Sequence, residues 1–219
     1  LSYHEQKDIE NIKKLRELQK ELPSFCSDFF RGIETSTSTR TRIAYAYDLK
    51  IFFQFLKTAN PGTFDNPSHT LTPSDLEKLT VTDLEEYIDY LKCHPSDTNE
   101  DVINTERGLM RKLSSLRSFY SYFFRNERIE KNPAALVRMP KLHEKEIIRL
   151  EIDEVAKLLD EVEEGDKLTE KQKLYHERTK VRDLAMMSLL LGTGIRVSEC
   201  VGLNINDIDL DTCGARVYR

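Results

Sequence analysis

The chain has 219 residues, of which 39% are hydrophobic and 32% charged, and its formal net charge is -5. This length allows one large domain or two modest ones with real hydrophobic cores. No apolar run is long enough to cross a bilayer and no secretory signal opens the sequence, so we expect a cytoplasmic protein without a membrane partner. The negative total argues mildly against nucleic-acid binding, but binding depends on where the charge lies.

The cysteines argue against a metal centre or a disulfide framework. Cys26, Cys93, Cys200 and Cys213 are scattered, and no CxxC pair occurs. Structural zinc sites and disulfide scaffolds both depend on clustered cysteines. We therefore expect reduced thiols and no bound metal.

The first part of the chain is predicted to be helical. Apolar spacing over residues 9–22 predicts a first helix that Pro23 ends. A short helix over residues 25–32 follows, and the polar run 35–39 supplies candidate N-caps. The next helix is predicted from a stripe of four apolar residues, namely Tyr45, Leu49, Phe52 and Leu56.

Two further helices and a connector follow. Thr82 and Glu85 have the spacing of a capping box for a helix through Leu91. The longest helix is predicted over residues 100–126, with an apolar stripe at Leu109, Leu113, Leu116, Tyr120 and Phe123. Residues 132–141 are expected to be extended, because residues that precede proline disfavour the helical region.

The last part of the chain is predicted to combine helices with a short hairpin. A helix begins near Ile152, and the charged run 163–173 is predicted to be a loop. An apolar helix over residues 184–191 ends at a glycine pair. Residues 208–210 and 215–218 are expected to form the two strands of a hairpin.

Basic charge is concentrated after residue 106. Residues 66–106 hold ten carboxylates and only two lysines, whereas residues 107–141 hold nine basic residues and only two acidic ones. A stripe opposite the apolar one on the longest helix consists of Arg107, Arg111, Ser114, Ser118, Ser121 and Arg125. Guanidinium groups supply forked donors for phosphate, and short hydroxyls allow close approach. A merely solvated helix face would explain the same pattern.

One local motif carries more information. The apolar helix ends at Gly192 and Gly194, and a new helix begins at once. Arg196 and Glu199 are three residues apart on its first turn. A glycine-capped helix followed by a surface ion pair would account for the motif taken alone.

In its context the motif resembles a known family. Residues 182–203 resemble the segment that carries the first catalytic arginine in tyrosine recombinases, the family of phage integrases and Xer-like resolvases. Residues 206–210 are similar to the entry to that family's first catalytic strand. Upstream, residues 41–52 are similar to the first main helix of its core-binding domain. Residues 113–120, followed by 132–141, are similar to the last helix and linker of that domain.

The resemblance implies a mainly α fold. A helical, SAM-like core-binding domain would precede the start of an α+β catalytic domain with a short β-hairpin. We expect an N-terminal helix or arm over residues 1–22, the core-binding domain over 23–140 and an incomplete catalytic domain over 141–219.

The resemblance also implies a chemistry. Members of the family cut one DNA strand with a tyrosine hydroxyl, and a second DNA end attacks the resulting 3′-phosphotyrosyl intermediate. Neither a metal nor another cofactor is needed. By resemblance Arg196 would grip a non-bridging phosphate oxygen, and Glu199 would hold that arginine in place. The implied partners are double-stranded DNA and, in the complete protein, three further copies forming a tetramer.

The other catalytic groups of the family are not found in this sequence. None of the five histidines, which are His4, His69, His94, His143 and His176, begins a His-x-x-Arg motif. The family's lysine and nucleophile are expected beyond Arg219, and Tyr218 is expected to pack in the second strand. We therefore expect the chain alone not to cleave DNA.

Six residues are our candidates for DNA contact: Thr41, Arg42, Arg111, Lys112, Ser115 and Arg117. Aromatic residues of the apolar stripes are expected to be core rather than base-stacking platforms, namely Tyr45, Phe52, Tyr120 and Phe123. Two other classes of function stay open. One is a DNA-binding module without catalysis, and the other is a helical protein-interaction scaffold, which the acidic segment favours.

Overall fold

Two compact units make up the protein. The computed structural model describes residues 3–95, 100–143, 146 and 148–217. Unit 1 extends to residue 144 and unit 2 begins at residue 145, close to the predicted boundary at residue 140. None of the described helices has the length and apolar character needed to span a membrane.

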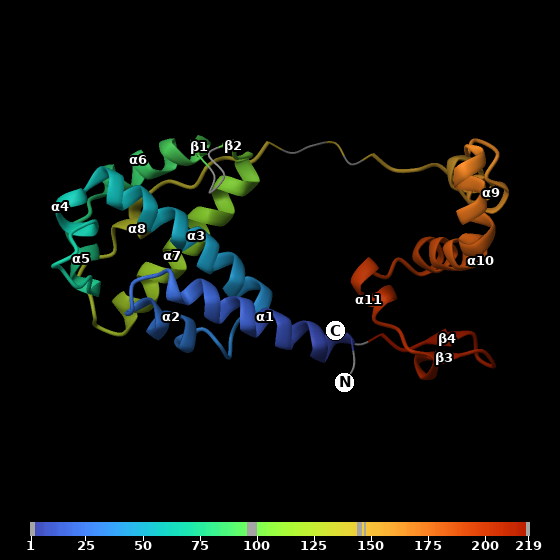
Figure 1. Ribbon diagram of the computed structural model, residues 1–219, viewed down its shortest axis with the longest axis horizontal. Coiled ribbons are helices and arrows are strands. Elements are labelled where there is room, and N and C mark those ends of the chain that lie inside the picture. The colour runs from blue at the N-terminus through green and yellow to red at the C-terminus, as the bar shows by residue number, and fades with distance from the viewer. Residues whose placement is uncertain (1–2, 96–99, 144–145, 147, 218–219) are drawn as a thin grey trace. The chain divides into compact units, whose positions relative to one another are not determined.

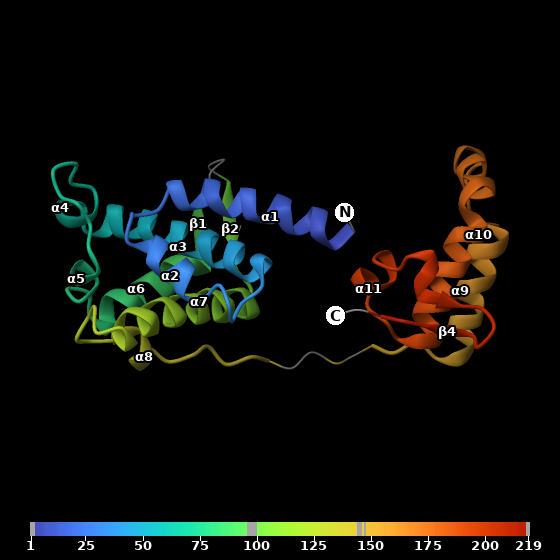
Figure 2. The same ribbon diagram turned by 90° about the horizontal axis from the view of Figure 1, so that it is seen from below.

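Unit 1 is a helical bundle with one small hairpin (Figure 1). Its elements are α1 (Tyr3–Lys20), α2 (Cys26–Gly32), α3 (Thr39–Ala59), α4 (Pro61–Phe64), α5 (Pro73–Leu76), α6 (Val81–Lys92), β1 (Cys93–Pro95), β2 (Asp101–Ile103), α7 (Glu106–Arg125) and α8 (Pro133–Leu136). Helix α1 lies along α3, and α7 packs against α2, α3 and α6 (Figure 2). The predicted mainly α fold is confirmed.

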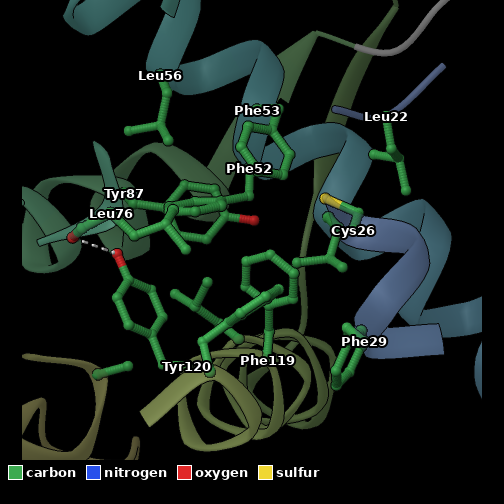
Figure 3. Close-up of a cluster of buried hydrophobic side chains, with 14 of the residues drawn as sticks. Leu22, Cys26, Phe29, Phe52, Phe53, Leu56, Leu76, Tyr87, Phe119 and Tyr120 are labelled. Carbon is green, nitrogen blue, oxygen red and sulfur yellow. Dashed lines mark hydrogen bonds between the residues drawn. The ribbon is translucent and has the colours of Figure 1, made fainter. Parts of the chain in front are cut away.

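The core of unit 1 is built on α7. The predicted stripe on this helix is buried throughout, from Leu109 to Phe123. Phe119 lies at its centre, with its ring edge-to-face against Phe29 at 5.2 Å between centroids and against Phe123 at 5.1 Å (Figure 3). Each such pair contributes about 0.5–1.5 kcal/mol beyond area burial. The Tyr120 hydroxyl donates to the Leu76 carbonyl at 3.2 Å, so its polar end is satisfied inside the core.

The helix predicted over residues 100–126 as the longest begins later than expected and, at 20 residues, is shorter than the 21-residue α3. Residues 101–103 form β2, which pairs antiparallel with β1 in the register Cys93 to Ile103. Helix α7 begins only at Glu106, because the Thr105 hydroxyl caps it by accepting from the Gly108 N–H at 3.3 Å.

The capping box of α6 was also misplaced by two residues. Thr80 and Asp83 form it, with the Thr80 N–H donating to the Asp83 carboxylate at 2.7 Å. Thr80 has the extended backbone of an N-cap, whereas Thr82 already lies inside the helix.

Unit 2 consists of helices and the predicted hairpin. Its elements are α9 (Ile152–Glu164), α10 (Glu170–Thr193), α11 (Val197–Val201), the 3₁₀ helix η1 (Ile205–Asp207), β3 (Ile208–Asp209) and β4 (Gly214–Ala215). Antiparallel pairing of Ile208 with Ala215 confirms the hairpin, while Tyr218 lies outside the described residues. The predicted loop 163–173 is too long: only residues 165–169 separate α9 from α10, because a Thr169 and Gln172 capping box starts α10 early.

The described part of unit 2 has almost no buried core. Between residues 148 and 217 only Gly165 is buried. Large apolar side chains are exposed instead, among them Ile152 at 89%, Val181 at 78% and Leu210 at 84%. Since burial of apolar surface is the main term that stabilises folded proteins, these helices have little to oppose local opening.

We expect the two units to differ in amide hydrogen exchange. Amides of α10 should exchange on the order of a hundredfold or more faster than those of the buried α7 turns, after correction for intrinsic rates. Exchange followed by mass spectrometry on one sample of the chain provides both values. Equal protection of α10 and α7 would contradict the assignment of low stability to unit 2.

Candidate nucleic-acid interface and catalytic arginine

Two of the candidate residues lie at the start of α3. Ser38 caps this helix and accepts a hydrogen bond from the Thr41 N–H at 3.2 Å, so Thr41 is held in the first turn. Arg42 turns towards the body of unit 1, where its Nη1 donates to the Glu34 carboxylate at 2.9 Å. Only 11% of the Arg42 side chain is exposed. Thr41 therefore stays near the surface, and Arg42 is largely withdrawn from it.

Arg111 makes a bidentate ion pair with Asp48 of α3. Its Nη1 and Nη2 lie 2.6 and 2.7 Å from the two carboxylate oxygens. The Asp48 side chain is 3% exposed and the Arg111 side chain 47%. Burial raises the pKa of the Asp48 carboxyl, and the positive charge of Arg111 opposes that rise. Arg111 thus neutralises a buried carboxylate while part of its guanidinium faces solvent.

Lys112 and Ser115, two of the predicted DNA contacts, do not lie on the outer face of α7. Ser115 is fully buried and Lys112 is 9% exposed. The Lys112 ammonium donates to the Asn104 side-chain oxygen at 2.6 Å, and burial lowers the pKa of Lys112. Both residues fall on the helical face that also carries Leu109 and Leu116.

Arg117 holds the connector instead of facing outward. Its Nε donates to the Ala134 carbonyl at 3.1 Å, and its Nη2 donates to the Val137 carbonyl. The side chain is half-buried in this position. Arg117 therefore has a structural partner that its sequence context did not reveal.

A second contact ties the connector to the first turn of α7. The Glu106 carboxylate accepts from the His143 backbone N–H at 3.0 Å and lies 2.6 Å from its ring Nδ1. Glu106 and Arg117 are separated by about 16 Å of helix, and residues 137–143 can span about 20 Å when extended. The connector therefore returns along α7 from its middle to its beginning.

The predicted arginine and serine stripe does lie on the outside of α7. Arg107, Ser114 and Arg125 are exposed, and Ser118 and Ser121 are half-buried. Arg107 has no ion-pair partner among the described residues. The stripe had identified Arg107 and Arg125, but our six candidates left them out. They are the arginines of α7 best placed to meet an external anion.

In unit 2 the structure brings Arg196 and Glu199 together. Helix α10 ends at Gly194, whose φ of +67° is the left-handed conformation that favours glycine. Arg196 follows as the N-cap of α11, and its backbone N–H donates to the Glu199 carboxylate at 2.8 Å. The Arg196 Nη1 donates to the other oxygen of the same carboxylate at 3.0 Å.

This arrangement exposes the arginine and buries its partner. The Arg196 side chain is 69% exposed, whereas the Glu199 side chain is 11% exposed. Glu199 restrains one nitrogen of the guanidinium, and the remaining donors are directed to solvent. The donors that Glu199 does not use can bind one phosphoryl oxygen or two while the contact with Glu199 is kept.

Comparison with known proteins matches both units to one family. Residues 28–127 match the phage integrase N-terminal SAM-like domain, and residues 148–219 match the phage integrase family. Similar curated proteins include tyrosine recombinase XerC of Caldanaerobacter subterraneus subsp. tengcongensis, 34% identical over 86% of this chain and 50% of the relative. XerC of Chlorobaculum tepidum is 30% identical over 93% of this chain and 55% of the relative. XerS of Streptococcus uberis is 31% identical over 95% of this chain and 64% of the relative. The chain thus spans about half to two thirds of these relatives.

We expect replacement of the two partners of the ion pair between α3 and α7 to destabilise the protein by different amounts. Arg111→Met should lower the free energy of unfolding by about 2–4 kcal/mol, because it removes the guanidinium that pairs with both oxygens of the buried Asp48 carboxylate. Asp48→Asn should cost about 1–2 kcal/mol, because the half-exposed guanidinium can be hydrated. Urea unfolding followed by far-UV circular dichroism measures both. Arg107→Met, one turn away and exposed, is the matched control, and an equal loss in Arg107→Met and Arg111→Met would refute the role of the pair.

Proposed function

Because the chain belongs to the phage integrase family of tyrosine recombinases, we propose that unit 1 grips duplex DNA and that unit 2 supplies the first arginine of a strand-cleaving active site. The observation that carries the proposal is the exposed Arg196 guanidinium restrained by the less exposed Glu199. A preorganised donor of this kind typically contributes about 10²- to 10³-fold to the rate when charge develops on the group that it contacts.

In the complete protein the reaction would proceed in two transfers. A tyrosine hydroxyl attacks the scissile phosphorus, the bond to the 5′-oxygen breaks, and that oxygen leaves as a hydroxyl after gaining a proton. A 5′-hydroxyl of a second DNA end then attacks the phosphotyrosyl bond and releases the tyrosine. Arg196 would bind a non-bridging oxygen in both steps. We place this activity in the cytoplasm and in a tetramer on two duplexes.

The chain by itself would bind DNA without cutting it. Its sequence contains no His-x-x-Arg motif, so the set of donors around the phosphate is incomplete. For this polypeptide alone, the expected behaviour is therefore that of a DNA-binding module.

We assign DNA contact in unit 1 to the exposed face of α7 and the start of α3. Arg107, Arg125 and the free part of Arg111 would meet phosphates, and Thr41 would supply a hydroxyl contact. The exposed basic residues that follow α7 extend the same charge into the connector, and they comprise Arg128, Lys131, Arg138 and Lys141. This local excess of positive charge would outweigh the total of -5.

Duplex binding should depend strongly on salt. If about six phosphates are neutralised, the slope of log affinity against log salt should be near -5, measured by fluorescence anisotropy with a labelled duplex. The double variant Arg107→Ala, Arg125→Ala should flatten the slope by about 2, whereas Lys57→Ala on the far end of α3 should leave it unchanged. Affinity that does not vary with salt would reject DNA binding and favour the protein-interaction scaffold.

The role of Arg196 is testable in the full-length protein. Arg196→Ala should reduce strand cleavage by about 10²-fold or more and leave duplex affinity within a few fold, because one donor is lost mainly in the transition state. Cleavage of a nicked substrate, normalised to bound complex, measures this effect. Arg178→Ala, which removes an exposed arginine from α10, is the control. Lost binding with normal cleavage per bound complex would show that Arg196 has a different role.

A further inference from the structure

A pocket of about 300 Å³ in unit 1 is lined by three arginines, which are Arg16 of α1, Arg31 of α2 and Arg42 of α3. We call it the arginine pocket. Its floor includes the buried side chains of Leu15 and Phe30. It is separate from Arg196, which belongs to unit 2, and from the exposed stripe of α7, none of whose residues lines it.

Positive charge exceeds negative charge around this pocket. Glu34 is the one carboxylate among its lining residues, and it is bound to Nη1 of Arg42. Arg31 has a distant contact of 3.9 Å with Asp28. Arg16 has no ion-pair partner among the described residues. At least one guanidinium therefore has no nearby countercharge.

Arg42 adds a second observation. Its side chain is 89% buried, and its Nε is enclosed without a hydrogen-bond partner. A buried donor without a partner is costly, and an arginine beside an apolar floor is less screened than one in water. Because Glu34 already pairs with Arg42, an anion in the pocket would supply countercharge mainly to Arg16 and Arg31.

We propose that the arginine pocket binds a phosphate group. A carboxylate offers two oxygens to two forks, whereas a phosphate offers acceptors on several sides and can meet guanidinium groups from three different helices. At about 300 Å³ the pocket is large enough for one such group. The source of the group is either a DNA backbone or free phosphate, and the inference holds for either.

The test follows the arginine side chains directly. Nitrogen-15 NMR of the arginine Nε–H groups, recorded during titration with inorganic phosphate, should show saturable shifts of the Arg16 and Arg42 signals. Arg16→Gln should weaken phosphate binding about three- to tenfold, as expected for the loss of one exposed charge-assisted contact. Arg40→Gln is the matched control, because this substitution removes the same charge. Arg40 is exposed on the same helix as Arg42 and does not line the pocket.

Arg16→Gln is the primary variant, since Arg16 is exposed and its replacement leaves the core intact. A short duplex that shifts the same signals and competes with phosphate would support the pocket with DNA as the source. Shifts with phosphate but not with duplex would support it with free phosphate as the source. Unchanged Arg16 and Arg42 signals in both titrations, or equal losses in Arg16→Gln and Arg40→Gln, would overturn the inference. Salt-dependent duplex binding without those shifts would overturn it while leaving the proposed function intact.

Discussion

A carboxylate enclosed between two helices must be neutralised, and much of unit 1 depends on how this is done. Asp48 belongs to α3, and the fork of Arg111 on α7 binds both of its oxygens. The pair fixes the rotation and register of α7 against α3, because a bidentate contact tolerates little displacement. Helix α7 also carries Phe119 into the aromatic core and presents Arg107 on the outside. The ion pair and the buried stripe of α7 thus together keep Arg107 on the solvent side of the helix.

The sequence pattern predicted the buried face of α7 and the contact between Arg196 and Glu199, because helical periodicity is a local property. Burial of Leu109 and Phe123 followed from their spacing, and the contact between Arg196 and Glu199 followed from a separation of three residues on a first turn. Long-range partners were not accessible in the same way. Arg111 and Asp48 are 63 residues apart, so the spacing of residues along α7 cannot predict that Arg111 pairs with a buried carboxylate.

The differences between the sequence-based predictions and the structure have a common physical origin. The helical wheel of α7 gave no sign that Lys112 would turn inward to the Asn104 side chain, because polar groups enter a core when a specific partner is present. The first turn of α10, residues 170–173, was included in a predicted loop because the run 163–173 is charged and contains Gly165. A capping box at Thr169 and ion pairs such as Lys173 with Glu170 support a helix there.

The anchoring of the connector on α7 has a consequence for the length of chain that joins the two units. With His143 held by Glu106, nine peptide steps separate the anchored chain from the start of α9, a reach of at most about 30 Å. Without that contact and the one from Arg117, the tether would begin near Leu136 and extend to about 55 Å. The two polar contacts on α7 thereby leave a shorter stretch of chain between the anchored part of unit 1 and α9.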